Sequence, residues 1–503
     1  MIYFRKNAWN NGGTFDNPDL LWYAKGVKAM QEKPLNDQNS WWFFAAIHGV
    51  DLHSGTFPDW NAIPAPPTIS TGPEPSEEIK RQFWNQCQHQ SWYFPPWHRG
   101  YLIALEDQIR GEILAQGGPV DWALPYWNYL GPDDQNVIPP AFSAEKMPDG
   151  SDNPLFFAAR YGPNDDEGGD VDVYVPRGSV SDACQDQSFY TGNRRINPGY
   201  GSLKTGFNHS GGVNGKLEAD PHNLVHVYVG GEDGAMSNPR SAALDPIFYL
   251  HHCNIDRMWA HWNNGRSNPV DPDWLNGPAA IGEREFVMPM RDGTAWVFTP
   301  GEMTSLDNLN YRYDDLTRGS AKKSFNPLAM RLNKLGIPAI DFDLPTLDEK
   351  RESVTEMVGA TEGDHQVGKT GLSTRLKLDD KSWKNVPLSL KNVSIDSLPD
   401  HIFLMIENVR GVKDSNILNI TVNNKNVGKV ALFGLKSASD PNDHHGGSGL
   451  NFVIDISDII DELHLRDQLD ISDLHVGISP KKAVNDKSKL SIGRISLHRE
   501  AVQ

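Results

Sequence analysis

The sequence predicts a mainly helical, loop-rich first domain followed by an all-β sandwich. The first part of the chain is rich in Trp and His, and its apolar residues recur at spacings of three and four, the period of an amphipathic helix. Beyond about residue 370, short segments alternate apolar and polar residues between turns, as antiparallel strands do. We divide the chain into a first domain (1–318), a linker (319–370) and a β-sandwich domain (371–503).

Helical spacing of apolar residues is seen in three segments of the first domain. Their sequences are NSWWFFAAIHGVDLH, RGYLIALEDQIRGEILAQ and ALDPIFYLHHCNIDRMWAHW. Asp245-Pro246 marks the start of the third helix, because proline is favoured at early helical positions. A long loop rich in Gly, Pro, Asn and Asp is expected over 130–215, and the linker is charged and interrupted by Pro and Gly.

The second domain is predicted to contain short strands with one helical insert. The insert is SDIIDELHLRDQ. The expected strands are STRLKL, VPLSLKNV, IFLMIENV, NILNITVN, VGKVALFG, LNFVIDIS, LHVGIS and KLSIGRISL.

Composition argues against several classes of partner. The chain has 47 basic and 65 acidic residues, and this net charge of −18 disfavours binding to nucleic acid or to an anionic membrane. No apolar run approaches the roughly 20 residues of a membrane span, and the start MIYFRKNAWNN lacks the apolar core of a signal peptide. Cys87, Cys184 and Cys253 are too few for a disulfide framework. We therefore expect a soluble, cytoplasmic protein.

A pair of histidines in PHNLVH indicates a metal site. His222 and His226 are four residues apart, so both project from one face of a helix and can bind one metal. For an isolated pair at this spacing, two surface histidines are about equally common. The zinc-protease motif HExxH does not fit, because Asn223 stands where that motif needs its glutamate base.

A third ligand for this pair is expected in DPIFYLHHCNIDRMW. Adjacent helical residues point about 100° apart, so only one of His251 and His252 can face the metal. His252 shares a helix face with Phe248 and Asp256, and we predict it to be the ligand. His251 is expected to lie beside the ligands without binding the metal itself. Asp256 is expected to form a buried ion pair with Arg257; a plain surface charge is the alternative.

A second group comprises His48, His89 and His98. Pro95-Pro96 interrupt the segment between the last two, which places His89 on a loop and His98 at a helix start. His48 falls in an apolar helix, where a lone histidine is usually a hydrogen-bonded core residue. The other five histidines make metal binding the better interpretation. His53 is a rival on the same helix, but its DLHSG context is typical of a helix end.

Together these motifs resemble the type-3 copper family, which comprises tyrosinases, catechol oxidases and haemocyanins. The resemblance covers the whole first domain and rests on FFAAIHG, on CQH followed by FPPWHR, on PHNLVHVYVGG and on DPIFYLHHCNIDRMW. It implies a four-helix bundle around two copper ions, with O₂ as co-substrate. An all-imidazole site suits copper. By motif match, copper A would be held by His48, His89 and His98, and copper B by His222, His226 and His252.

The resemblance implies three further structural features. Members with a CxH pair can have a Cys–His thioether, which maps onto Cys87 and His89; a reduced buried thiol is the alternative. Tyr311-Arg312-Tyr313 resembles the YxY motif that closes the catalytic domain and pairs with an N-terminal arginine, here Arg5. The sandwich resembles the C-terminal domain of plant-type polyphenol oxidases and haemocyanins.

Glu218 and Asn223 match a pair that in this family is linked to a water that deprotonates monophenols. Two acceptors can polarise one water, and a phenol must lose its proton before it binds copper. Alternatively, Glu218 only caps the helix start. The bulky aromatic residue that often stands over copper A is replaced by Pro239, and Met236 resembles the gate residue. The substrate gate should therefore be more open than in many catechol oxidases.

The resemblance thus implies a polyphenol oxidase that hydroxylates small monophenols and oxidises o-diphenols to o-quinones, reducing O₂ to water. The alternatives are a catechol or o-aminophenol oxidase without the first activity, and a haemocyanin-like O₂-binding protein; a structural zinc site would waste ligands and lacks thiolates. The sandwich is expected to cover the site and keep the enzyme latent, with Phe433 or Leu435 as the shielding residue. A stability or assembly module is the alternative role.

Overall fold

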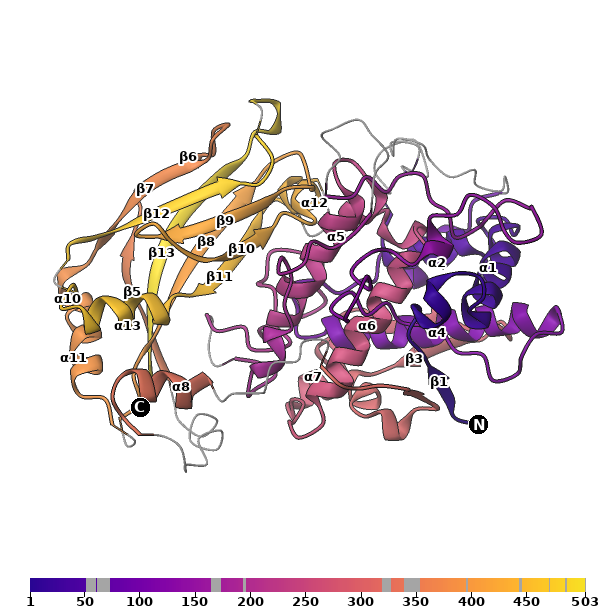
Figure 1. Ribbon diagram of the computed structural model, residues 1–503, viewed down its shortest axis with the longest axis horizontal. Helices are drawn as coiled ribbons and strands as arrows, with labels where there is room; N and C mark the ends of the chain where they lie inside the picture. Colours follow the sequence, from indigo (N-terminus) through magenta and orange to yellow (C-terminus); the bar gives the residue numbers. More distant parts are fainter. Residues whose placement is uncertain are drawn as a thin grey trace. The chain divides into compact units, whose positions relative to one another are not determined.

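The computed structural model describes residues 1–50, 60, 73–163, 173–192, 196–318, 327–338, 353–394, 397–442, 446–469, 471–484 and 486–502. The chain forms two compact units. The first comprises Met1–His89, Tyr93–Asp182 and Asp220–Ala321, and the second comprises Gln90–Trp92, Ala183–Ala219 and Lys322–Gln503. Part of the long loop of the expected first domain therefore groups with the β-rich part of the chain (Figure 1).

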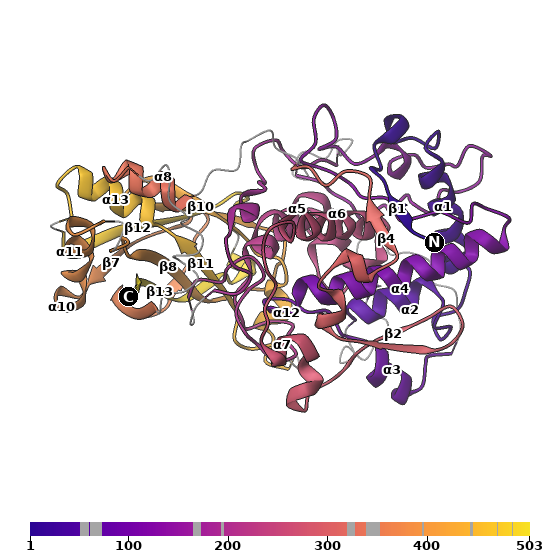
Figure 2. The same cartoon turned by 90° about the horizontal axis from the view of Figure 1, so that it is seen from below.

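The first unit is mainly helical, as predicted, and Figure 2 shows α4 and α6 side by side within it. Its helices are α1 (Pro18–Gln31), α2 (Trp41–His48), α3 (Glu77–Phe83), α4 (Phe94–Ala115), α5 (Asn223–Gly230), α6 (Ile247–Trp262) and α7 (Pro272–Asn276). Short helical turns in the chain are η1 (Asn10–Gly13), η3 (Pro140–Phe142), η4 (Ala183–Asp186), η5 (Glu218–His222), η6 (Ala235–Ser237), η7 (Ala242–Leu244), η8 (Pro278–Ile281), η9 (Pro300–Met303), η10 (Leu306–Asn308) and η11 (Asp486–Ser488). Two small sheets complete the unit: β1 (Tyr3–Arg5) with β4 (Tyr311–Tyr313), and β2 (Phe286–Pro289) with β3 (Ala295–Phe298).

Local sequence explains where the histidine-bearing helices begin. The Ser40 hydroxyl accepts a hydrogen bond from the backbone N–H of Phe43 and caps α2. In α4, Pro95 and Pro96 lie in the first turn, where a backbone N–H would have no helical partner, so the helix starts before them at Phe94. The side chain of Asp245 accepts from the N–H of Ile247, the first residue of α6, at 3.0 Å, and the helix begins directly after Pro246, next to the predicted start.

The ends of the first unit are tied to α6 through buried charges. Asp256 accepts hydrogen bonds from Arg99 at 2.6 Å and from the hydroxyls of Tyr311 and Tyr313 at 2.6 and 2.5 Å. Arg5 pairs with the same carboxylate at 3.2 Å, and its guanidinium lies 3.7 Å from the Tyr311 ring centre. The predicted pairing of Arg5 with the two tyrosines is confirmed. Burial alone would raise the pKa of Asp256, but Arg99 and Arg5 hold it below its usual value.

The predicted Asp256–Arg257 ion pair is wrong. Adjacent helical side chains diverge, and Arg257 donates instead to the side chain of Asn254 and to the backbone oxygens of Asp315 and Thr317. Asp256 is buried, so the surface-charge alternative is also excluded.

The β-rich part of the second unit contains one large sheet. Its nine described strands follow the order β10-β9-β12-β7-β5-β13-β8-β11, with β6 paired to β13. The terminal strands β10 and β11 contact each other, so the sheet nearly closes around its core. The strands are β5 (Ser353–Ala360), β6 (His365–Gln366), β7 (Leu372–Leu378), β8 (His401–Arg410), β9 (Ile417–Val422), β10 (Lys425–Ala431), β11 (Leu450–Asp455), β12 (Asp473–Pro480) and β13 (Ser491–Val502).

Five described helices accompany this sheet, and two of them, α8 and α11, lie where the prediction had a linker or a strand. The five are α8 (Pro327–Lys334), α10 (Asp380–Trp383), α11 (Asn385–Lys391), α12 (Leu435–Ser439) and α13 (Ser457–Leu465). The helical insert is confirmed as α13. The expected strand VPLSLKNV is instead α11, because Val386 and Leu390, four residues apart, both enter the core. The expected linker contains α8, β5 and β6, and β5 pairs with β13.

The shielding candidates lie where the sheet leads into α12. Leu435 is a member of the sheet's own hydrophobic core, and its shielding role stays a prediction. Phe433 is also buried but is not a member of that core, and its shielding role stays a prediction. Among the described residues, no helix is long and apolar enough to cross a bilayer.

The buried charges predict a large effect of Asp256→Asn. The change leaves Arg5 and Arg99 buried without their shared counter-charge, so we expect a loss of about 3–5 kcal/mol in the free energy of unfolding of the first unit. Urea unfolding followed by tryptophan fluorescence measures it. The exposed Asp121→Asn variant serves as control, and equal midpoints for the two variants would contradict the role assigned to Asp256.

Candidate metal centre

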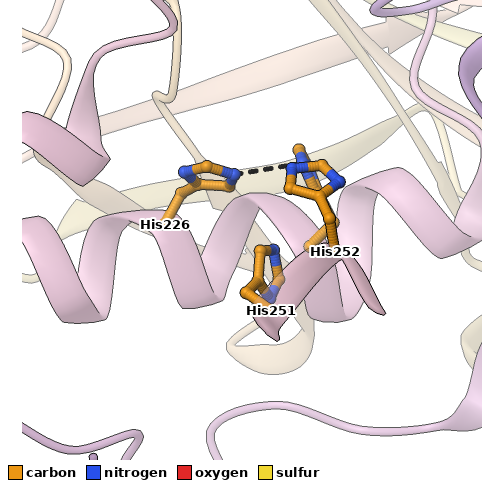
Figure 3. A group of neighbouring side chains, drawn as sticks. His226, His251 and His252 are labelled. Carbon is orange, nitrogen blue, oxygen red and sulfur yellow. Dashed lines mark hydrogen bonds between the residues drawn. The ribbon is translucent and has the colours of Figure 1, made fainter. Parts of the chain in front are cut away.

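Two groups of buried histidines lie in the first unit. One consists of His48, His89 and His98, and within each group the possible donor atoms lie within 4.8 Å of one another. The members of the second group are His222, His226, His251 and His252. Figure 3 shows His226 of α5 together with the neighbouring His251 and His252 of α6. The structure therefore brings together all six histidines that were predicted as ligands, and adds His251.

Each histidine is positioned by the end or the face of a helix. His48 is the last residue of α2, and His98 lies near the start of α4, with His89 on the preceding loop as predicted. His222 directly precedes α5 and His226 lies one turn later, which brings their Nε2 atoms to 3.1 Å. His53 lies outside the described residues.

Backbone carbonyls orient three of the rings. The Nδ1 atoms of His48, His98 and His226 lie 2.7–2.8 Å from the carbonyl oxygens of Pro239, Phe94 and Met236, respectively. A carbonyl oxygen only accepts, so each Nδ1 must carry the proton, which leaves the Nε2 lone pair available for a metal.

The remaining nitrogens fit a bound metal ion. The Nε2 atoms of His48 and His98 are buried, and no described residue hydrogen-bonds to them. Leaving such atoms without a partner is unfavourable, and a metal would satisfy them. His222 fits the same arrangement, because its Nδ1 lies 2.8 Å from Oδ1 of Asn223.

Burial keeps the rings neutral, as metal binding requires. It lowers the pKa of His48 to about 4 and the pKa of His226 to about 3. Burial also lowers the pKa values of His98, His222 and His252 well below that of free histidine, and neighbouring histidines lower them further. At neutral pH these imidazoles can therefore bind a metal without first losing a proton.

The two groups adjoin each other. The rings of His98 and His252 are stacked, with centres 4.3 Å apart and planes inclined by 8°. The rings of His89 and His222 are 5.8 Å apart. Two metal ions bound by these groups would therefore be neighbours, and imidazole-only coordination favours copper over calcium or magnesium.

His251 and His252 differ in what surrounds them. His252 contacts the first group through His98, whereas the His251 ring lies 5.2 Å from His222 and 5.6 Å from Tyr129. Neither ring has a hydrogen-bond partner among the described residues. The geometry allows both as donors to the second group, so the choice of His252 as ligand stays a prediction.

A glycine allows one of the orienting carbonyls to approach. A Cβ on Gly49, directly after His48, would lie 2.9 Å from the Pro239 oxygen, closer than real Cβ atoms come to their neighbours. Met236 and Pro239, predicted as gate residues, thus also provide backbone acceptors. The Met236 side chain is fully buried. Their role at the substrate gate stays a prediction.

Glu218 is held by a residue that the sequence did not indicate. Both of its carboxylate oxygens accept from the backbone N–H of Gln90 at 2.9 Å. Burial raises the pKa of Glu218 well above its usual value, although the Gln90 N–H lowers it in part. Sequence reasoning missed Gln90 and the carbonyl acceptors because every residue type carries these backbone groups. Cys87 is buried two residues before His89, and no disulfide joins the described cysteines.

Comparisons with known proteins agree with this geometry. Residues 38–265 match the family model for the common central domain of tyrosinase, and residues 354–500 match a domain of unknown function (DUF7868). The chain is 32% identical to tyrosinase HcTyr1 of Hahella sp. (strain CCB-MM4) over 96% of this chain and 97% of that protein. It is 29% identical to polyphenol oxidase II of Ipomoea batatas over 59% of this chain, but only 48% of that protein.

Solved structures share the two-part fold. Latent apple tyrosinase matches with a TM-score of 0.57 at 18% identity, over 100% of this chain and 97% of that one. Recombinant latent aurone synthase matches with a TM-score of 0.57 at 20% identity, over 100% of this chain and 90% of that one. At these identities the likeness concerns the fold: a helical domain followed by a β-rich domain, as the sequence predicted.

Proposed function

Because the chain belongs to the tyrosinase family of type-3 copper oxidoreductases, we propose that it hydroxylates monophenols to o-diphenols and oxidises o-diphenols to o-quinones with O₂. The observation that carries the proposal is the pair of adjoining, buried, neutral histidine groups. Copper bound there would supply the oxidising chemistry. The similarity to HcTyr1 along nearly the full length, a protein named as a tyrosinase, supports the hydroxylating activity.

The chain's own contribution is to hold the rings and to accept the phenolic proton. The carbonyls of Pro239, Phe94 and Met236 keep three Nε2 atoms directed away from the backbone. Glu218 is buried, and a carboxylate whose pKa is raised by burial accepts a proton more readily than a solvated one. We assign Glu218, assisted by Asn223, to the water that removes the proton from a monophenol.

One observation favours the alternative of a catechol or o-aminophenol oxidase. Both oxygens of Glu218 already accept from Gln90, and Oδ1 of Asn223 already lies at hydrogen-bond distance from His222. Each oxygen has a second lone pair, so a water can still be bound, but its geometry is restricted. A haemocyanin-like O₂-binding protein is a further alternative. Measurement of phenol turnover distinguishes it from an oxidase, because a protein that only binds O₂ would not turn over phenols.

We predict two copper ions per chain. Metal analysis after copper loading should give about two equivalents, and His98→Ala or His226→Ala should reduce this to about one and remove oxidase activity. His464→Ala, in α13 of the second unit, is the matched control and should keep both ions. An active His98→Ala enzyme would refute the assignment.

Glu218→Gln should separate the two activities. Loss of the proton acceptor should reduce kcat/KM for a monophenol roughly a hundredfold relative to the wild-type protein. The kcat/KM for a diphenol should stay within about threefold of the wild-type value. O₂ uptake with both substrates in parallel measures the ratio, with the exposed Glu145→Gln as control. If the wild-type chain oxidises diphenols but never monophenols, the alternative of a catechol oxidase replaces this proposal.

We also predict a thioether between Cys87 and His89. Its formation removes one hydrogen from the thiol and one from the ring, a two-electron oxidation in which O₂ takes up both hydrogens as H₂O₂, so the peptide should be about two hydrogens lighter by mass spectrometry. Under denaturing conditions Cys184 and Cys253 should react with an alkylating agent, whereas Cys87 should not. An alkylated Cys87 in copper-loaded protein would exclude the bond.

Finally, we propose that the β-rich domain keeps the enzyme latent. It contributes no histidine to either group among the described residues. Cleavage within 339–352, followed by mild detergent or acid, should raise kcat/KM for a diphenol by roughly tenfold, if most molecules are covered beforehand. Copper content should not change. Equal kcat and KM before and after cleavage would show that the domain is not a cover.

A further inference from the structure

The edge of the large sheet is occupied by the segment that leads to Glu218. Among the described strands, β11 pairs with β8 alone, and a parallel bridge joins Asn451 of β11 to Val213. The Asn451 Nδ2 lies 3.5 and 3.4 Å from the carbonyl oxygens of Gly211 and Gly212. All of these residues belong to the second unit. An exposed sheet edge is commonly covered in this way by another segment.

The same segment packs against Gln90. The Asn208 side-chain amide donates to the Gln90 carbonyl at 3.3 Å. A Cβ on Gly212 would lie 2.2 Å from that carbonyl oxygen, so only glycine allows this approach. Gln90 itself has a φ of 52°, in the left-handed region that costs free energy for a non-glycine residue unless its surroundings hold it. The 208–212 segment therefore fixes one side of Gln90.

The opposite side of Gln90 holds the carboxylate. Its N–H donates to both oxygens of Glu218 at 2.9 Å. The segment between Val213 and Glu218 is also fixed, because the N–H groups of Lys216 and Leu217 donate to the carbonyls of Gly199 and Tyr200 at 3.0 and 3.1 Å. Burial lowers the pKa of Lys216 in this segment, although Asp455, at the end of β11, raises it in part.

We infer that the β-rich domain positions Glu218, with Asn451 as the residue that fixes the supporting segment to the sheet edge. The inference rests on the proposed function, since it assigns the proton-accepting role to Glu218. It makes the domain a determinant of specificity between monophenols and diphenols. Detaching the domain should therefore lower the ratio of monophenol to diphenol kcat/KM, even where uncovering the site raises diphenol turnover.

Asn451→Asp tests the contact with little change in size. The Oδ1 of Asn451 accepts from the Asn408 N–H at 2.9 Å, and aspartate keeps this acceptor. The amide donor toward Gly211 and Gly212 is replaced by an oxygen that repels their carbonyls. We expect the monophenol to diphenol ratio of kcat/KM to fall roughly three- to tenfold, the effect of losing a hydrogen-bonded contact, with copper content unchanged.

Asn416→Asp is the matched control. Asn416 also accepts backbone N–H groups, from Ile417 and Lys482, and donates to the Lys482 carbonyl at 2.8 Å, and none of these hydrogen bonds involves the 208–218 segment. The control should share any general destabilisation of the domain and keep the wild-type ratio. An equal fall of the ratio in both variants, or no fall in Asn451→Asp, would overturn the inference.

Gly212→Ala provides an independent variant, since its methyl group must displace the Gln90 carbonyl. It should lower the same ratio with copper content unchanged, and a wild-type ratio would contradict the inference. The Glu218→Gln variant distinguishes failure of the positioning inference from failure of the proposed function. If Glu218→Gln changes the ratio while Asn451→Asp and Gly212→Ala do not, only the positioning inference fails. If Glu218→Gln leaves the ratio unchanged, the proton-accepting role proposed for Glu218 is wrong, and the positioning inference that rests on it is wrong too.

Discussion

The carboxylate of Asp256 is the charge on which the arrangement of the histidine-bearing helices depends. It lies one helical turn after His252, and its partner Arg99 directly follows His98. A buried carboxylate is tolerated only when its partners satisfy it completely. The ion pair therefore fixes α4 and α6 relative to each other close to His98 and His252. Arg5 and Tyr313 bring the two ends of the first unit to the same point. The metal centre therefore depends on residues distant from it in the sequence.

Local patterns predicted what depends on local spacing. The period of apolar residues identified α2, α4 and α6, and the four-residue spacing placed His222 and His226 on one face. The errors concern long-range partners. Asp256 pairs with Arg99, 157 positions away, and not with its neighbour in sequence. An alternating pattern became α11 because tertiary packing, which propensity does not encode, decided between helix and strand.

The supporting groups of the site could not be predicted for a different reason. The acceptors that orient His48 and His226 are backbone carbonyls, and the donor to Glu218 is the backbone N–H of Gln90. No side-chain identity distinguishes such groups, and only the fold selects which of them face the site. Gly49 is a partial signal, because a glycine directly after a predicted ligand indicates a close backbone approach.

Orientation of the rings by carbonyl oxygens has an electrostatic consequence. In many metal sites a carboxylate accepts from the ligand histidine and contributes a negative charge beside the metal. Here the acceptors for His48, His98 and His226 are neutral, as are the rings themselves. The positive charge of bound ions would thus be little compensated in a buried region of low dielectric constant. Such a centre would attract anionic ligands in preference to neutral ones of the same shape.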